Sequence, residues 1–146
     1  MKHIYNYQEY IKEQKVLSYY EVTEKQEEGD PYFDCIFSNE TSEFVEETIH
    51  IVKLRELNGF SNDREDELEQ TVSYFKELGF DEDYHVSKKI MDKIVDGIKL
   101  NNIVVDENYK ILDGSHRLAA YSELYFYYGY DFPFDGDLKI YKRIKN

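Results

Sequence analysis

The stretch Ile111-Leu112-Asp113-Gly114-Ser115-His116-Arg117-Leu118-Ala119-Ala120 runs from a short apolar segment through a polar turn into a segment with the apolar spacing of a helix. The N–H groups at the start of a helix lack partners and carry the positive end of the helix dipole, so they attract phosphate. Gly114 lets the backbone approach a ligand closely, and His116 and Arg117 add charged donors. We therefore predict a strand, a turn and a helix that together form an anion site.

Sequence patterns on both sides of this stretch predict a mixed order of strands and helices. Residues 102–105 and 109–112 are largely apolar and are separated by a short turn, as in a hairpin. Asn62 or Asp63 can cap a helix that Gly79 ends. The other expected elements are a strand at 48–54, helices at 87–96 and 115–128, and a strand at 138–144. This order predicts an α+β domain, with a small mixed sheet packed against about three to four helices.

The first 45 residues combine two kinds of pattern. Tyr7, Tyr10 and Ile11 fit one face of a helix, whereas residues 16–23 and 32–37 are rich in residues that favour strands. A Glu-Gly-Asp-Pro turn at 28–31 separates the two strand candidates. Neither a repeat nor a linker marks a domain boundary, so we expect a single domain over residues 1–146.

The charge balance of the chain disfavours nucleic acid as a partner. The sequence has 18 Lys and Arg against 31 Asp and Glu, which gives a formal net charge of −13. Such a surface repels the phosphates of DNA unless a local basic patch compensates. The weakly basic end of the chain, at residues 139–145, is the one candidate for such a patch.

The hydropathy of the chain predicts a cytoplasmic protein that does not enter the membrane. The first residues lack the apolar core of a signal peptide, and no run approaches the ~20 apolar residues of a membrane span. The single cysteine, Cys35, excludes an internal disulfide. Its apolar neighbours Phe33, Ile36 and Phe37 favour a buried, unreactive thiol.

The order of these elements resembles the ParB/sulfiredoxin superfamily. The shared pattern is a helix, an Asn-Ile-Val-Val-Asp strand, a short turn, a strand ending in Asp-Gly-x-His-Arg, and a helix that begins Leu-Ala-Ala. The resemblance covers residues 87–124 and, more loosely, the expected strands at 48–54 and 138–144. It implies a ParB/sulfiredoxin-like core at residues 46–146 and an N-terminal extension of unknown role at residues 1–45.

Three activities known within this superfamily differ at the turn. Sulfiredoxins carry a reactive cysteine where this chain has Ser115, which argues against sulfinic-acid repair. The chromosome-partitioning proteins use a Gly-Glu-Arg-Arg type of motif, whereas this chain has Ser115, His116 and Arg117. Free-serine kinases carry Asp-Gly-His-His-Arg, which differs from residues 113–117 only at Ser115. The turn is therefore most similar to that of the kinases.

The resemblance implies a role for each residue of the turn. Gly114, Ser115, His116 and Arg117 would bind the phosphates of ATP or ADP, with CTP as a further candidate. Asp113 would lie near the substrate hydroxyl or a magnesium ion. Because the sequence has no cluster of metal ligands, the phosphates of the nucleotide would hold this ion, with Asp113 as a further candidate ligand.

A second carboxylate is implied after the first strand of the core. The candidates for this catalytic residue are Glu56 and the less well placed Glu65. Together these residues predict a nucleotide-binding phosphotransferase, a kinase acting on a hydroxyl of a small molecule. The alternatives are a nucleotide-binding switch without transfer chemistry and a ParB-like protein associated with DNA.

Simpler explanations exist for the same residues. Asp113 and Ser115 both favour the N-cap of a helix, so the turn could serve only to begin one. The four histidines show no metal-ligand spacing, which disfavours zinc. The aromatic residues at 125–128 fit the core and its rim, or alternatively a partner interface or a surface on which a nucleobase stacks.

Overall fold

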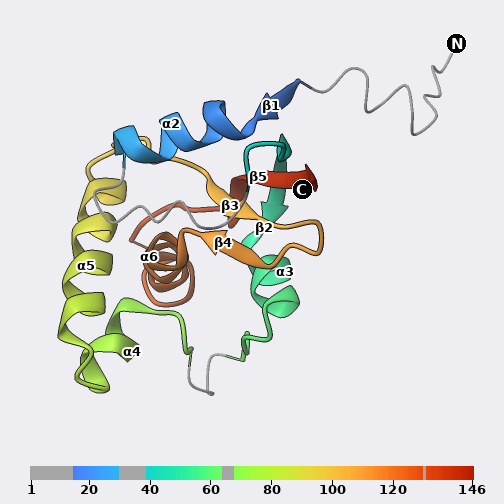
Figure 1. Cartoon of the computed structure of the whole chain (residues 1–146). Helices are drawn as coiled ribbons and strands as arrows, with labels where there is room; N and C mark the ends of the chain where they lie inside the picture. Colours follow the sequence, from blue (N-terminus) through green and yellow to red (C-terminus); the bar gives the residue numbers. More distant parts are fainter. Residues whose placement is uncertain (1–14, 30–38, 64–67, 130) are drawn as a thin grey trace, which may run out of the picture.

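The computed structural model describes residues 15–29, 39–63, 68–129 and 131–146. These residues form five strands and five helices around one sheet (Figure 1). In chain order they are β1 (Val16–Ser18), α2 (Tyr19–Gly29), β2 (Glu43–His50), α3 (Ile51–Leu57), α4 (Val72–Glu77), α5 (Asp81–Val95), β3 (Ile103–Val105), β4 (Ile111–Asp113), α6 (Ser115–Phe126) and β5 (Asp137–Lys145).

The sheet is mixed, and its strands are ordered β1-β2-β5-β3-β4. β2 pairs antiparallel with both β1 and β5, and β3 pairs antiparallel with β4. β5 and β3 are parallel, which makes β5 the centre of the sheet although it is the last strand along the chain. The α+β class predicted from the sequence is confirmed, with five helices rather than three to four.

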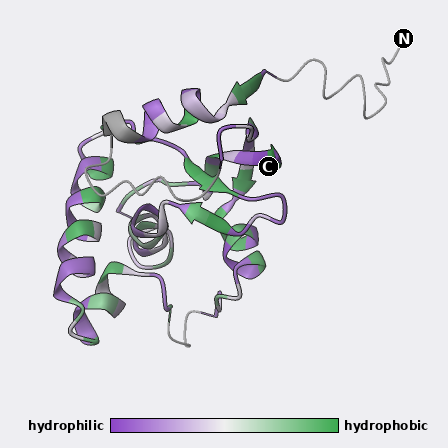
Figure 2. Cartoon of the chain, viewed as in Figure 1, coloured by the Kyte–Doolittle hydropathy of each residue, from purple (hydrophilic) through white to green (hydrophobic). Residues whose placement is uncertain are grey.

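Helices cover both faces of the sheet. One face packs against α3 and α6 through a cluster that includes Leu54, Ile103, Leu118 and Ile140. On the other face, Val22 of α2 joins a second cluster with residues of β1, β2, β3 and β5. Successive residues of β3 point to opposite faces, as expected for a strand. In Figure 2, β1, β3 and β4 are mostly apolar, whereas much of α5 is polar.

The segment expected as a strand at residues 16–23 is a strand only as far as Ser18, and the rest of it belongs to α2. Ser18 Oγ accepts a hydrogen bond from the Glu21 N–H at 3.2 Å, and Glu21 Oε1 accepts one from the Ser18 N–H at 3.3 Å. This reciprocal pair is a capping box, which satisfies two N–H groups at the start of a helix. The capping box explains why the strand-favouring residues after Ser18 are helical.

The strand expected at residues 48–54 was also placed wrongly. β2 ends at His50, whose Nδ1 accepts a hydrogen bond from the Val52 N–H at 3.2 Å and so caps α3. Ile51 and Leu54 are fully buried and lie three residues apart on one helical face. The apolar run therefore belongs to the buried side of a short helix, and the strand lies earlier, over Glu43–His50.

The two helices expected before the hairpin exist with different bounds. Of the helix expected from residues 62–63 to Gly79, only α4 is helical among the described residues. It starts after Thr71, and the Thr71 Oγ1 accepts a hydrogen bond from the Tyr74 N–H at 3.1 Å. α5 begins at Asp81, well before the expected start at residue 87, because three acidic residues stabilise its first turn. Val95, the last residue of α5, is 53% exposed.

The elements around the polar turn are confirmed. β3 and β4 form the expected antiparallel hairpin, α6 follows β4 directly, and β5 covers the expected strand at 138–144. Tyr7, Tyr10, Ile11, the strand candidate at 32–37 and Cys35 lie outside the described residues.

Candidate functional site

The turn between β4 and α6 depends on a glycine. Gly114 is the N-cap of α6 and has φ of 113°, in the left-handed region. A Cβ at this position would lie 3.0 Å from both Ile103 Cγ1 and Arg117 Nη2, closer than such contacts normally are. The N-cap Gly114 provides no side-chain cap for this 12-residue helix, and no side chain among the described residues accepts a hydrogen bond from the N–H groups of Ser115 and His116.

A buried polar cluster lies on the interior side of this turn. Asp113 Oδ2 accepts a hydrogen bond from Gln26 Nε2 at 2.7 Å and forms an ion pair with Arg117 Nη2 at 3.2 Å. The carbonyl oxygen of Asn102 accepts from the same two groups, at 3.1 Å and 3.4 Å. Gln26 is fully buried and Arg117 is 2% exposed. The Arg117 guanidinium therefore faces the interior, where it holds the turn in place through its contacts with Asp113 and the Asn102 carbonyl oxygen.

Gln26 is a residue that the sequence did not point to. It lies on α2, in the region expected to be an extension, and it connects α2 to the last residue of β4. Asn101, in the segment before β3, makes a further contact with α2, because its side-chain amide donates to the carbonyl oxygen of Lys25. The capping box at Ser18 is a local signal that predicts α2, but no local signal predicts which residue of the helix reaches Asp113.

Ser115 and His116 lie on the solvent side of the turn. Ser115 is exposed, and the side chain of His116 is 33% exposed. His116 Nε2 lies 2.7 Å from Oδ1 of Asp83, in the first turn of α5. Asp83 was missed because the apolar pattern of the sequence predicts the start of this helix at residue 87. The acidic run 81–83 is itself the signal of a helix N terminus.

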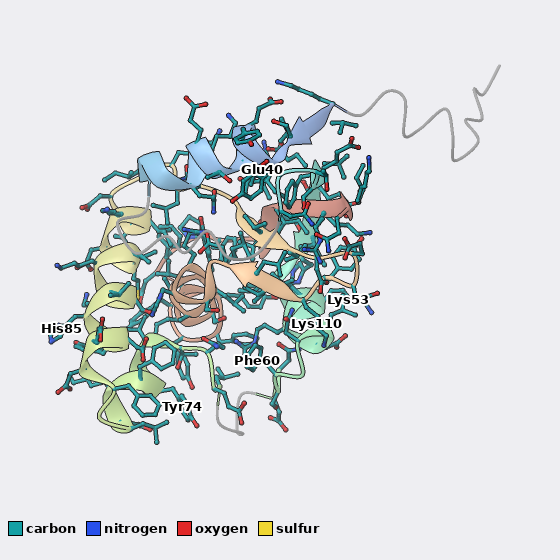
Figure 3. All side chains as sticks on the ribbon, in the orientation of Figure 1. Glu40, Lys53, Phe60, Tyr74, His85 and Lys110 are labelled. Atoms are coloured by element: carbon teal, nitrogen blue, oxygen red, sulfur yellow. The ribbon has the colours of Figure 1, made fainter. Side chains whose placement is uncertain are left out.

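Glu56 is not brought to this turn by any contact among the described residues. It is exposed on α3, and the end of α3 is attached to the beginning of β4. Asn58 Nδ2 donates to the Tyr109 carbonyl oxygen at 2.9 Å, and Asn58 Oδ1 accepts from the Ile111 N–H at 3.0 Å. Figure 3 shows Lys110 beside α3, where its Nζ donates to the Leu57 carbonyl oxygen.

β4 separates these contacts from Gly114. A three-residue strand spans about 10 Å, so the end of α3 and the turn lie at opposite ends of β4. Glu65, the other candidate for the second carboxylate, lies outside the described residues.

The surroundings of Asp113 do not suit a magnesium ligand. Its side chain is 10% exposed, and Oδ2 is already approached by the amide of Gln26 and the cationic Arg117. A cation at this oxygen would have to displace both donors, and Mg²⁺ gives up its water shell reluctantly. Asp113 is therefore placed to hold the turn in shape.

Comparisons with family models, with curated proteins and with solved structures gave no match to this chain. In the described parts of the chain, no helix is both long and apolar enough to cross a membrane.

Proposed function

We propose that this protein binds a nucleotide through its phosphates at the N terminus of α6 and transfers a phosphoryl group to a hydroxyl of a small molecule. The observation that carries the proposal is the start of α6, where the N-cap Gly114 lies in the left-handed region and provides no side-chain cap, and where exposed Ser115 lies in the first turn. Phosphate oxygens are natural acceptors for such N–H groups, and the helix dipole favours their charge.

In this proposal the turn works as a preorganised anion site. The N–H groups of Ser115 and His116 and the hydroxyl of Ser115 bind the phosphates. The Asp113–Arg117 pair keeps the turn rigid, so that little reorganisation accompanies binding. ATP or ADP is the expected nucleotide, CTP is a further candidate, and magnesium is expected on the phosphate oxygens themselves.

A thermal-shift titration with ATP, ADP and CTP, each with magnesium, tests nucleotide binding. A ligand present at 100 times its Kd stabilises the native state by about 2.7 kcal/mol, which corresponds to several degrees for a domain of this size. The informative variant is Ser115→Asp, because a carboxylate at a helix N terminus favours folding but repels phosphate. We expect an unchanged or higher Tm without ligand and loss of the nucleotide shift.

Asn108→Asp is the matched control, since it adds one negative charge at an exposed position at the other end of β4. This variant should keep the nucleotide shift. Absence of a shift in the wild-type protein with all three nucleotides would show that the proposal is wrong.

A nucleotide-binding switch without transfer is the second candidate. It is favoured by the placement of the carboxylates, because Asp113 is already bonded to Gln26 and Arg117, and Glu56 lies on a helix attached to the far end of β4. The two candidates differ in turnover. Incubation with ATP, magnesium and a panel of hydroxylated metabolites yields a phosphorylated product only for a transferase, whereas both candidates show the thermal shift.

A further inference from the structure

His116 is paired with a carboxylate from another helix. Asp83 on α5 and His116 on α6 are 33 residues apart in the sequence, and Asp83 Oδ1 lies 2.7 Å from His116 Nε2. A carboxylate can only accept a hydrogen bond, so Nε2 carries the proton in this pair. The neutral ring has a single N–H, and the pair therefore fixes the tautomer whose lone pair is on Nδ1.

The pair is accessible to a ligand. The side chains of His116 and Asp83 are 33% and 46% exposed, in contrast to the 3% and 10% of Arg117 and Asp113 beneath the turn. His116 Nδ1 has no hydrogen-bond partner among the residues that the structure describes. An oriented imidazole with an available lone pair thus lies in the first turn of α6, beside the proposed phosphate site.

Phosphoryl transfer to a hydroxyl needs a group that accepts the hydroxyl proton. Of the carboxylates expected from the sequence, the two that lie within the described residues are not well placed for this. Asp113 Oδ2 is buried among donors, and Glu56 lies on a helix attached to the far end of β4. The imidazole of His116 is the accessible basic group that the described structure places at the turn.

We propose that His116 accepts the hydroxyl proton during the transfer and that Asp83 positions it, an inference that rests on the proposed function. The hydroxyl oxygen of the substrate forms a new bond to the terminal phosphorus of the nucleotide. The bond from that phosphorus to the bridging oxygen breaks, and its electron pair remains on the departing nucleotide. The hydroxyl proton passes to Nδ1 of His116, and the resulting imidazolium is stabilised by the Asp83 carboxylate.

A purely structural pair joining α5 to α6 would behave differently from a catalytic one. Asp83→Asn preserves the size of the side chain, but its amide can donate to Nε2 and so allow the other tautomer. We expect the nucleotide-induced thermal shift to be retained, kcat to fall at least about 10-fold and KM to change less than about 2-fold. His116→Gln should lower kcat about 100-fold or more, as expected for loss of a proton acceptor.

Asp92→Asn is the matched control, because Asp92 is an exposed aspartate of the same helix that pairs with Lys88. Turnover in this variant should equal that of the wild-type protein. Both reactions are measured with ATP and magnesium, with water and with a panel of hydroxylated metabolites as acceptors. Nitrogen-15 spectra of the imidazole ring provide a readout independent of turnover. The wild-type His116 should be the Nε2–H tautomer, and Asp83→Asn should change that population.

The outcomes separate the two proposals. If the wild-type protein shows no nucleotide shift or no product with any acceptor, the proposed transfer is wrong and the role of His116 in it is wrong with it. If the wild-type protein turns over and Asp83→Asn has the same kcat, the transfer stands and the inference about the pair is overturned. An Nδ1–H tautomer in the wild-type spectrum also overturns it.

Discussion

Arg55 Nη1 donates a 2.9 Å hydrogen bond to Ser122 Oγ, and this bond joins α3 to α6 across 67 residues of sequence. Arg55 is fully buried, and its other N–H groups donate to Asn62 Oδ1 and to the carbonyl oxygens of Ser61 and Gln70. Burial lowers the pKa of Arg55 to about 10, with an opposing effect from the charge of Glu69. A buried guanidinium therefore attaches the segment that follows α3 to the centre of the molecule.

Replacing this arginine should destabilise the fold strongly. Arg55→Met keeps the side-chain length but leaves the carbonyl oxygens of Ser61 and Gln70 without their donor. Since hydrogen bonds to charged groups contribute about 1.5–3 kcal/mol each, we expect a loss of about 3 kcal/mol or more in the free energy of unfolding, measured by urea titration. Lys88→Met, which breaks an exposed ion pair, is the control and should cost about 0.5 kcal/mol or less. Equal effects for the two variants would contradict this role of Arg55.

Gln26→Glu should make stability depend on pH. The variant places a second carboxylate 2.7 Å from Asp113 Oδ2, so one of the two acids is disfavoured in its charged form when the protein is folded. The pKa of that acid is therefore raised in the folded state. The variant keeps its full stability below the unfolded pKa of about 4.3 and loses stability as the pH rises above it. The stability difference from wild type should be large at about pH 7.5 and smaller at about pH 4.5. Gln26→Met, which cannot ionise, should show a difference that varies little between these two pH values.

Gly136→Ala should be more damaging than Gly97→Ala. Both glycines have positive φ, of 95° and 81°, so both substitutions place alanine in the left-handed region at a cost of about 1 kcal/mol. A Cβ at Gly136 would also lie 2.4 Å from His50 Nε2, which contacts the Asp135 carbonyl oxygen, whereas nothing lies within 4 Å at Gly97. We expect Gly136→Ala to cost about 1–3 kcal/mol more than its control, from differences in Tm or urea midpoint. Equal losses of stability in the two variants would show that the His50 side chain moves aside at no cost in free energy, which contradicts the prediction.

Tyr121 should contribute to the loss of stability at alkaline pH. Burial raises its pKa, and the charge of Arg117 partly opposes that shift. The folded state therefore holds the phenolic proton more tightly than the unfolded state, whose pKa is about 10. This contribution to stability is complete below about pH 10 and is lost as the pH rises through the folded pKa. Tyr121→Phe should lose less stability than the wild-type protein between about pH 9 and 11, and parallel losses would refute the assignment.

Local signals account for the parts of the fold that were predicted correctly. The hairpin, α6 and β5 have clear patterns of turn and apolar residues, and Asp113 and Gly114 lie where the sequence placed the end of the strand and the start of the turn. The error at residues 48–54 has a tertiary cause, because an apolar run can belong to either a buried strand or the buried side of a short helix. The cap formed by His50 decides between them, since it ends β2 and begins α3.

The residues that contact the turn could not be predicted from the sequence for a different reason. Gln26 and Asp83 lie 87 and 33 residues from the residues that they contact, and no periodicity encodes such pairings. For Arg117 the position in the sequence was predicted, but the orientation of the side chain was not. Only its burial and its contacts with Asp113 and the Asn102 carbonyl oxygen show that its guanidinium faces the interior.

The central position of β5 has a consequence for synthesis of the chain. Before residues 137–145 are available, the strands among the described residues form two separate pairs, β1 with β2 and β3 with β4, and the edges of β2 and β3 that later pair with β5 are open. The arrival of β5 joins them by pairing with strands far apart in sequence, which is slow compared with local pairing. We therefore expect the edges of β2 and β3 to be open to association with other chains until β5 is in place.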